Sequence, residues 1–270
     1  MSEQKTIVIS GTTTGIGRAT ALRLARENHN IITVNRPSSR EEVAFQELQP
    51  LGTGEKHRYL ADLSTEAGVR EAGLAISREI PKVDVLINNA GVFKTKESFS
   101  ADGEEMTFAV NVRAAAMLTG TLLPLLEQSG RGRVLFLSSE LYKRAKVATD
   151  NPLSPGKFNS SRVYAHSKML LTLLAGVLAE EYPATEFFSV HPGVIATDVF
   201  RDYPKFFTKL LNKMLPGPDT AAELLATLAL EDSQATNGSY FMEYKPRPVA
   251  EPVEAGKIKA SLLEYFRSLM

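Results

Sequence analysis

Hydrophobic and polar positions along this chain follow two alternating patterns. Short, nearly continuous apolar runs rich in β-branched residues are separated by longer runs in which apolar residues recur every three or four positions. The first pattern predicts buried strands and the second predicts amphipathic helices. The expected strands are 6–10, 30–35, 57–61, 83–88, 133–139, 186–191 and 239–242. The expected helices are 16–28, 41–49, 66–79, 103–128, 163–182, 219–229 and 257–269.

The regular alternation of strand and helix predicts the fold class. Buried strands separated by helices form a parallel sheet that is covered on both faces, and right-handed crossovers wind it in two directions. We therefore expect an α/β chain with a single-domain Rossmann fold, a doubly wound seven-stranded parallel sheet and helices on both faces. Neither a linker-like composition nor an internal repeat divides the chain, so one domain spans residues 1–270.

Two segments interrupt this rhythm and are candidates for substrate loops. Residues 140–163 form a polar stretch with two prolines and a glycine, and residues 198–218 place several apolar side chains between proline-bearing turns. Both follow strands at the carboxyl edge of the sheet, where open α/β folds bind ligands. The alternative is that both are simple surface excursions.

A glycine-rich turn follows the first expected strand and leads into the first expected helix. It contains Gly11, Thr13, Gly15, Ile16 and Gly17. Glycines permit a tight turn and close approach of the backbone to a pyrophosphate, while the start of the helix offers unpaired N–H groups. Glycines alone also occur in ordinary turns, but the strand–turn–helix context predicts a dinucleotide site.

The end of the second strand indicates which dinucleotide is bound. An NAD site has an acidic residue there to bind the ribose hydroxyls, whereas this chain has Asn35 followed by Arg36. A guanidinium pairs well with the 2′-phosphate of NADP, so we expect NADP(H) as cofactor. The alternative is that Arg36 is only a solvated loop residue.

Tyr164 and Lys168 are the strongest candidates for chemistry. They are four residues apart on an expected helix and therefore share one face. An ammonium near a phenol lowers its pKa, so that the tyrosine exchanges a proton with an alcohol or carbonyl oxygen. Tyr142 and Lys146 have the same spacing, but they lie in the polar stretch where no helix is expected, and we interpret them as a chance match.

Further candidates surround this pair. Ser138 and Ser139 end the fifth strand, and only one of them can face a substrate, because successive strand residues point to opposite sides. Asn111 lies within an expected helix, where it either holds a water in a relay to Lys168 or is a surface residue, which spacing alone favours. His166 projects away from the face shared by Tyr164 and Lys168, so we interpret it as a structural or surface residue.

Composition excludes several classes of function. The formal net charge is zero, which gives no support for a nucleic-acid partner, and the chain has no cysteine, so disulfides and thiolate catalysis are excluded. Its four histidines are scattered without metal-ligand spacing, so no metal is expected. The chain begins almost directly with a strand, and its apolar stretches look too short to span a bilayer. We expect a cytoplasmic protein without a membrane anchor.

Taken together, these motifs resemble the short-chain dehydrogenase/reductase family. The resemblance extends from Thr6 to about Met242, with the motifs in the order typical of the family. They are Gly11-x3-Gly15-Ile16-Gly17, Asn88-Asn89-Ala90-Gly91, Asn111, Ser139, Tyr164-x3-Lys168 and Pro192-Gly193. The 25-residue separation of Ser139 from Tyr164, the Tyr164-Ala-His-Ser-Lys168 motif and Asn237-Gly-Ser-Tyr-Phe241 are similar to the retinol dehydrogenase-like branch.

The resemblance implies a role for each matching residue. Tyr164 would be the general acid/base, Lys168 would lower its pKa and bind the nicotinamide ribose, Ser139 would orient the carbonyl, and Asn111 would complete a proton relay. The adenosine would be bound by Asp62, Leu63, Asn89, Ala90 and Gly91, and the nicotinamide by Pro192, Gly193, Ile195 and Thr197. Arg36 matches the arginine that selects NADP.

Three functions are compatible with this pattern. The first is an NADP(H)-dependent oxidoreductase that transfers hydride between the nicotinamide and a small-molecule carbonyl or alcohol, which the apolar 198–218 segment predicts to be fairly hydrophobic. The second is a non-catalytic nucleotide-sensing Rossmann protein, and the third is a sugar-nucleotide epimerase or dehydratase. The intact Ser139, Tyr164 and Lys168 set favours the first. The long helices 103–128 and 163–182 would suit a homodimer.

Overall fold

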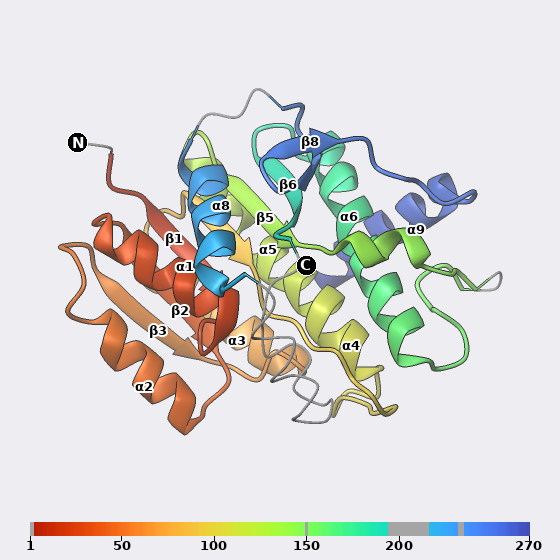
Figure 1. The fold of residues 1–270 in the computed structure, drawn as a ribbon, viewed down its shortest axis with the longest axis horizontal. Helices are drawn as coiled ribbons and strands as arrows, with labels where there is room; N and C mark the ends of the chain where they lie inside the picture. The colour runs from red at the N-terminus through yellow and green to blue at the C-terminus, as the bar shows by residue number, and fades with distance from the viewer. Residues whose placement is uncertain (1–2, 149–150, 194–215, 232–234) are drawn as a thin grey trace.

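A single eight-stranded sheet forms the centre of the protein (Figure 1). The computed structural model describes residues 3–148, 151–193, 216–231 and 235–270. The strand order is β3-β2-β1-β4-β5-β6-β7-β8, in which β1 to β7 are parallel. The strands are β1 (Thr6–Ser10), β2 (Asn30–Asn35), β3 (Lys56–Leu60), β4 (Val85–Asn88), β5 (Arg133–Leu137), β6 (Glu186–His191), β7 (Tyr240–Met242) and β8 (Lys245–Arg247).

The doubly wound Rossmann topology is confirmed, and the strand count is corrected from seven to eight. The added strand β8 pairs antiparallel with β7 at the edge of the sheet. Its three residues are exposed, so no buried apolar run marks it in the sequence.

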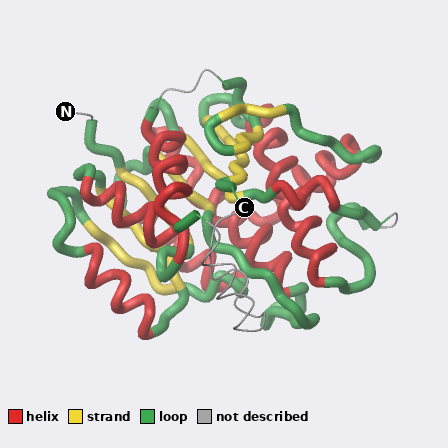
Figure 2. The backbone as a smooth tube through the Cα atoms, in the orientation of Figure 1, coloured by secondary structure: helices red, strands yellow, loops and turns green. Residues whose placement is uncertain are grey.

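Helices cover both faces of this sheet (Figure 2). They are α1 (Gly15–Arg26), α2 (Ser39–Leu48), α3 (Glu66–Glu79), α4 (Met106–Phe108), the π-helix η1 (Ala109–Arg113), α5 (Ala114–Gln128), the 3-10 helix η2 (Glu140–Arg144), α6 (Ser160–Glu181), α8 (Pro218–Leu230) and α9 (Ala255–Leu269).

Alternation along the strands separates two cores. In β1, Val8 belongs to a cluster with side chains of α3, α5 and α6, whereas Ile7 and Ile9 belong to a cluster with side chains of α1 and α8. This is the period-two alternation of a strand that is buried on both faces. Helices α1 and α8 lie side by side over one face (Figure 1), and α3, α5 and α6 cover the other.

The helix expected at 103–128 begins at Met106 and includes one π-helical turn at Ala109–Arg113. Among the described residues, Met106–Gln128 is the one helix that is long and apolar enough to cross a membrane, and 83% of its apolar window is buried in the fold. The expectation that no apolar stretch is long enough was therefore wrong by length and composition. The burial is that of a core helix, which is hydrophobic all round.

The C-terminal helix α9 packs against α5 and α6. Its buried residues recur at helical spacing and include Ile258, Leu262 and Phe266. The Phe266 ring meets the Tyr182 ring with centroids 5.9 Å apart. Gly120 of α5 leaves the room that α9 needs, because a Cβ at Gly120 would lie 3.0 Å from Met270.

The two candidate substrate loops differ in how much the structure describes. In 140–163, residues 140–144 form η2 and α6 begins at Ser160, three residues earlier than expected. Between them, Asn151–Gly156 forms turns that are closed by local hydrogen bonds. Most of the 198–218 segment lies outside the described residues.

Candidate active site

The glycine turn lies between the end of β1 and the start of α1. Gly11 and Gly15 have φ of +74° and +58°, a region in which side chains other than glycine are strained. A Cβ at Gly17 would lie 2.2 Å from Asn89 Nδ2 and 2.3 Å from Gly11 O. Asn89 Nδ2 in turn donates to Ser10 O at 2.9 Å and to Gly11 O at 2.8 Å. Asn89, expected at the adenosine, thus uses its amide nitrogen to hold the turn.

The first turn of α1 keeps its backbone N–H groups free of any side-chain cap. The side chains of Ser38, Thr65 and Asn159 accept from the first turns of α2, α3 and α6. Thr14 at the start of α1 makes no such bond, and the starts of α8 and α9 also have none. Unpaired N–H groups and the positive end of the helix dipole suit a phosphate. Thr13 and Ile16 are half-buried in this turn. The turn therefore fits the pyrophosphate of a dinucleotide.

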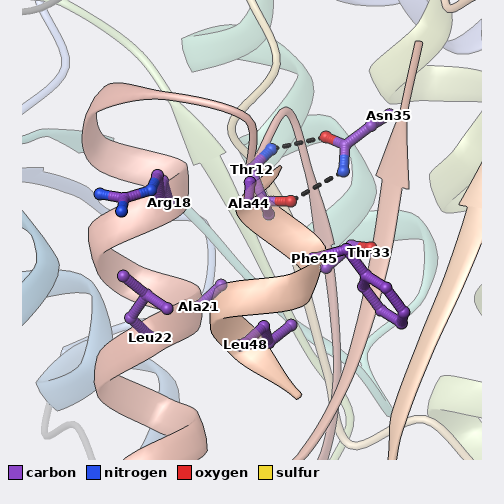
Figure 3. A pocket seen from close by; sticks show the side chains of 9 residues that line it. All are labelled: Thr12, Arg18, Ala21, Leu22, Thr33, Asn35, Ala44, Phe45 and Leu48. Atoms are coloured by element: carbon purple, nitrogen blue, oxygen red, sulfur yellow. Dashed lines mark hydrogen bonds between the residues drawn. The ribbon is translucent and has the colours of Figure 1, made fainter. Parts of the chain in front are cut away.

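At the end of β2, Asn35 and Arg36 have different environments. The Asn35 side chain accepts from Thr12 N at 2.7 Å and donates to Thr12 Oγ1 at 2.8 Å (Figure 3). Asn35 therefore holds Thr12 of the glycine turn in place. Arg36 is exposed at the same edge of the sheet. Figure 3 also shows a small hollow between α1 and α2, which is lined by apolar side chains of the two helices and by the polar residues Thr12, Arg18, Thr33 and Asn35.

The residues expected at the adenosine follow β3 and β4 at the same carboxyl edge. Asp62 is exposed and its Oδ1 accepts from Ser64 N and Ser64 Oγ at 2.9 and 2.8 Å. The Leu63 side chain is buried in the core, which leaves its backbone for contact with a ligand. A Cβ at Gly11 would lie 2.8 Å from Ala90 Cα, so the turns after β1 and β4 adjoin. This is the crevice where the strand order reverses.

Tyr164 and Lys168 lie on one face of α6, as their spacing predicts. Their exposures are 8% and 4%. Lys168 Nζ lies 5.5 Å from the centroid of the Tyr164 ring and donates to Leu137 O at 2.7 Å. The Phe93 ring contacts the Tyr164 ring at a centroid distance of 5.0 Å. The phenol and the ammonium are thus together at the end of β5.

Burial dominates the ionisation of both groups. Desolvation raises the pKa of Tyr164 to about 12, while the Ser139 hydroxyl acts in the opposite direction. Desolvation also lowers the pKa of Lys168 to about 8. The expectation that Lys168 brings the phenol pKa below its ordinary value was wrong for this structure. Removing the phenolate from water destabilises it more than the neighbouring groups stabilise it.

The choice between Ser138 and Ser139 is decided by their hydrogen bonds. The Ser138 hydroxyl lies in the core, 3.1 Å from Lys168 O and 2.7 Å from Thr172 Oγ1. Ser139 caps the start of η2, where its hydroxyl accepts from Leu141 N at 3.3 Å, and its hydroxyl acts to lower the pKa of Tyr164. Ser139 is therefore the serine that shares a site with Tyr164.

Asn111 is fully buried in the π-helical turn, so its interpretation as a surface residue was wrong. Its Oδ1 accepts from Val92 N at 2.8 Å, and its Nδ2 donates to Val92 O and Ser167 Oγ, both at 3.1 Å. The side chain thus joins the segment after β4 to α6. Single π turns of this kind are frequent at functional sites.

Gly91 separates Asn111 from Lys168. A Cβ at Gly91 would lie 3.5 Å from Asn111 Oδ1 and 3.6 Å from Lys168 Nζ. The absence of a side chain at Gly91 therefore leaves a point within reach of both polar atoms. A water or a ribose hydroxyl at this point would connect Asn111 to Lys168, as the expected relay requires.

The second tyrosine–lysine pair has no such arrangement. Tyr142 is 2% exposed, its hydroxyl accepts from Ala250 N at 2.9 Å, and its ring packs on Tyr240. Lys146 is exposed and lies beyond the end of η2. Tyr142 is a core residue, although the sequence places it in a polar stretch.

The remaining predicted residues follow β6. Pro192 and Gly193 are half-buried, and Gly193 has φ of +92°. Ile195 and Thr197 lie outside the described residues, so their predicted contacts with the nicotinamide stay predictions.

Sequence reasoning missed one charged residue close to the site. Arg113, two residues after Asn111, is fully buried and pairs with Asp102 at 2.7 Å and Glu104 at 2.8 Å. It also donates to Ser64 O at 2.6 Å. Arg113 thereby fixes the π-helical turn to the start of α3. Asp102 and Glu104 precede the helix that carries Arg113, and Ser64 is 49 residues away, so no i,i+3 or i,i+4 spacing marks these partners.

Comparison with known families shows which family this chain belongs to. The profile of the short chain dehydrogenase family matches residues 5–206, which include the glycine turn, Asn111, Ser139, Tyr164 and Lys168. The chain belongs to the short-chain dehydrogenase/reductase family. It is therefore an oxidoreductase by family, and its relatives place it in the retinol dehydrogenase-like branch.

Several relatives of this short-chain dehydrogenase extend over nearly all of it. Human retinol dehydrogenase 13 is 32% identical over 94% of this chain and 81% of its own length. Human retinol dehydrogenase 14 is 34% identical over 89% and 79%. Bovine dehydrogenase/reductase SDR family member 12 is 32% identical over 92% and 80%.

Solved structures share the fold at lower identity. Levodione reductase is 21% identical with a TM-score of 0.72, over 96% of this chain and all of that one. L-sorbose reductase from Gluconobacter frateurii, complexed with NADPH and L-sorbose, is 21% identical with a TM-score of 0.71, over 90% and 98%. Both support the Rossmann fold of the short-chain dehydrogenase.

Proposed function

We propose that this short-chain dehydrogenase is an NADP(H)-dependent carbonyl reductase or alcohol dehydrogenase with Tyr164 as its general acid/base. The observation that carries the proposal is the placement of Tyr164, Lys168 and Ser139 together at the carboxyl end of β5. Lys168 Nζ lies 5.5 Å from the Tyr164 ring, and the glycine turn lies at the same edge of the sheet. The non-catalytic nucleotide sensor is disfavoured, because nucleotide binding alone has no use for a buried phenol beside a buried ammonium.

The ionisation of the two buried groups favours proton donation to a carbonyl. With its pKa raised to about 12, Tyr164 keeps its proton near neutral pH, and Lys168, with a pKa of about 8, is largely protonated. As the Tyr164 proton passes to the carbonyl oxygen, the phenolate charge is offset by the ammonium of Lys168. The Ser139 hydroxyl donates to the same oxygen and orients it. A bound nicotinamide dinucleotide supplies the hydride.

The proposed preference for NADP(H) depends on the end of β2. Arg36 is exposed there, and Asn35, in the place of an acidic residue, is bonded to Thr12 and leaves the ribose side to Arg36. A guanidinium binds a 2′-phosphate through paired hydrogen bonds. NADPH in the L-sorbose reductase structure is compatible with this preference in the same fold.

The proposed substrate is an apolar carbonyl compound or alcohol of small-molecule size. The Phe93 ring beside Tyr164 gives the described part of the site an apolar wall, and the 140–163 segment leaves from Ser139 and returns to Tyr164. The names of the two human relatives make retinoids one class to test. A cytoplasmic location remains an expectation from the sequence.

A spectrophotometric screen of carbonyls and alcohols with NADPH, NADH, NADP and NAD tests the proposed function. We expect oxidation of NADPH with apolar aldehydes or ketones, including retinal, faster than with small polar ones. Binding of NADPH without turnover of any compound in the panel would contradict the enzymatic proposal and favour the nucleotide sensor.

The substitution Arg36→Asp tests the cofactor preference. An acidic residue repels a 2′-phosphate and accepts from the ribose hydroxyls of NAD. We expect the ratio of kcat/KM for NADPH over NADH to fall by roughly 100-fold, as two charge-assisted hydrogen bonds are lost. Arg247→Asp, which changes an equally exposed arginine in β8, at the other end of the strand order, is the matched control. Equal shifts in the two variants would show that the ratio follows net charge and that Arg36 does not bind the 2′-phosphate.

A further inference from the structure

His166 is a buried histidine beside the active site that the proposed chemistry does not use. It lies two residues after Tyr164 on α6 and is 1% exposed. Two residues on a helix are about 200° apart, so the imidazole faces away from the side that Tyr164 and Lys168 share. A buried polar side chain normally has a hydrogen-bond partner, and the partner of His166 indicates what this side chain does.

The partner of His166 is the backbone of the 140–163 segment. Its Nε2 lies 3.3 Å from Pro152 O, and the contact is buried. A carbonyl oxygen only accepts, so Nε2 carries the hydrogen and His166 is the donor. Burial lowers the pKa of His166 to about 4, which keeps the imidazole neutral near pH 7.

Pro152 lies in a turn whose other hydrogen bonds to described residues stay within the 140–163 segment, including the one that Ala148 N donates to Ser154 O at 3.2 Å. Leu153 N donates to Asn151 Oδ1 at 3.0 Å, Ser154 N donates to Asn151 O at 3.0 Å, and Gly156 N donates to Ser154 Oγ at 3.2 Å. These bonds shape Asn151–Gly156, and none of them joins it to α6. The half-buried Leu153 packs against a core cluster, and the His166 bond adds a directional attachment to α6.

The attached segment connects two residues of the proposed active site. It leaves the sheet at Ser139 and ends where α6 begins at Ser160, one turn before Tyr164. Because the chain runs from Ser139 through Asn151–Gly156 to the start of α6, a displacement of this turn alters the path of the segment between Ser139 and Tyr164, and the glycine turn is not part of that path. His166 and Tyr164 are on the same helix, so the His166–Pro152 bond attaches the segment directly to the helix that carries the phenol.

We propose that His166 is a positioning residue, which holds the 140–163 segment against α6 through Pro152 and so determines how the substrate fits over Tyr164. This inference rests on the proposed oxidoreductase function. It assigns His166 to substrate fit, with neither cofactor binding nor proton transfer depending on it.

The substitutions His166→Leu and His166→Gln form the test. Leucine removes the donor and leaves the buried Pro152 carbonyl unpaired, whereas the Nε2 of glutamine replaces the donating atom. For His166→Leu we expect KM for an accepted carbonyl substrate to rise roughly ten-fold, with kcat and the Kd of NADPH changed less than about two-fold. His166→Gln should recover most of the loss.

Hydrogen exchange gives a readout that does not depend on turnover. Amides in a peptide covering residues 151–159 should exchange roughly ten-fold faster in His166→Leu than in the wild type, and close to the wild-type rate in His166→Gln. Unchanged exchange in both variants would overturn the proposed attachment even if the enzyme is active. Faster exchange in a protein without carbonyl reductase activity would instead contradict the proposed function and keep the attachment.

A variant on the segment itself covers the case in which His166→Leu does not fold. Pro152→Gly loosens the turn from the other side and leaves α6 intact. We expect the same pattern, a higher KM with unchanged NADPH binding. An equal loss of NADPH affinity in Pro152→Gly would show that the segment does not act on the substrate alone, and would overturn the proposal.

Discussion

The two halves of the proposed site differ in which atoms form them. One half is the glycine turn beside β1, β2 and β4, and the other is the region of β5 and α6 that carries Tyr164. Around β1, β2 and β4, the site is made of backbone: positive-φ glycines, an uncapped helix start and two asparagines that hold the turn. Around β5 and α6, it is made of buried side chains, Tyr164 and Lys168, whose ionisation is shifted by desolvation. Binding and chemistry should therefore respond to different substitutions.

The largest expected effect comes from Tyr164→Phe. The change removes the proton donor and leaves the glycine turn untouched, so turnover should fall by roughly 10³-fold or more, as expected for loss of a general acid. The Kd of NADPH, measured by fluorescence titration, should stay within about two-fold of the wild type. A variant that keeps a tenth of wild-type turnover would show that the proton comes from elsewhere.

The converse substitution is Gly17→Ala, which should weaken NADPH binding and lower the stability of the fold. Its Cβ would lie 2.2 Å from Asn89 Nδ2 and 2.3 Å from Gly11 O, and the backbone must shift to relieve the contact. We expect the free energy of unfolding to fall by about 2–3 kcal/mol, measured by urea denaturation, together with weaker NADPH binding.

Gly176→Ala is the matched control on α6. A Cβ at Gly176 would meet nothing within 4 Å, so alanine should raise the free energy of unfolding by about 0.5–1 kcal/mol through better helix propensity. If both alanine variants were equally stable, the close packing between Gly17 and Asn89 would not be what the turn requires.

A smaller effect concerns Lys168, one of the buried side chains around β5 and α6. The folded protein lowers the pKa of Lys168 from 10.5 to about 8, so between these pH values the unfolded chain binds a proton that the folded chain does not. Stability therefore rises with pH across this window. Relative to Lys168→Met, the wild type should gain about 1–2 kcal/mol in free energy of unfolding from pH 8 to pH 10.

The same denaturation series in Lys168→Met cancels the titration of all other groups, because only the lysine differs. A constant difference between the two proteins across the window would show that Lys168 is not destabilised by burial. Its charge near neutral pH would then have no folding cost.

Sequence reasoning was most reliable where one residue type was required by local geometry. The glycine turn and the Tyr164–Lys168 spacing depend on contacts within a few positions of the chain, and the structure brings these residues together as predicted. The strand β8 is three exposed residues, and one π turn barely alters a helical pattern, so neither left a periodic signal.

The parts that were missed depend on contacts between distant segments. Asn111 is hydrogen-bonded to Val92 and Ser167, 19 and 56 residues away, and Arg113 donates to Ser64 O, 49 residues away. The direction of the Tyr164 pKa shift was also wrong, because the number of side chains that exclude water from a phenol cannot be read from the spacing of two residues.

Helix α9 limits which faces of α5 and α6 are available to a second copy of the protein. The homodimer expected through residues 103–128 and 163–182 would need bare α5 and α6 faces, but α9 is already packed against both helices through Phe266 and its neighbours. The chain thus supplies from its own C-terminal end the apolar cover that a second copy would otherwise provide. A homodimer through residues 103–128 and 163–182, which stays a prediction, would have to use parts of these helices that α9 leaves uncovered, or displace α9.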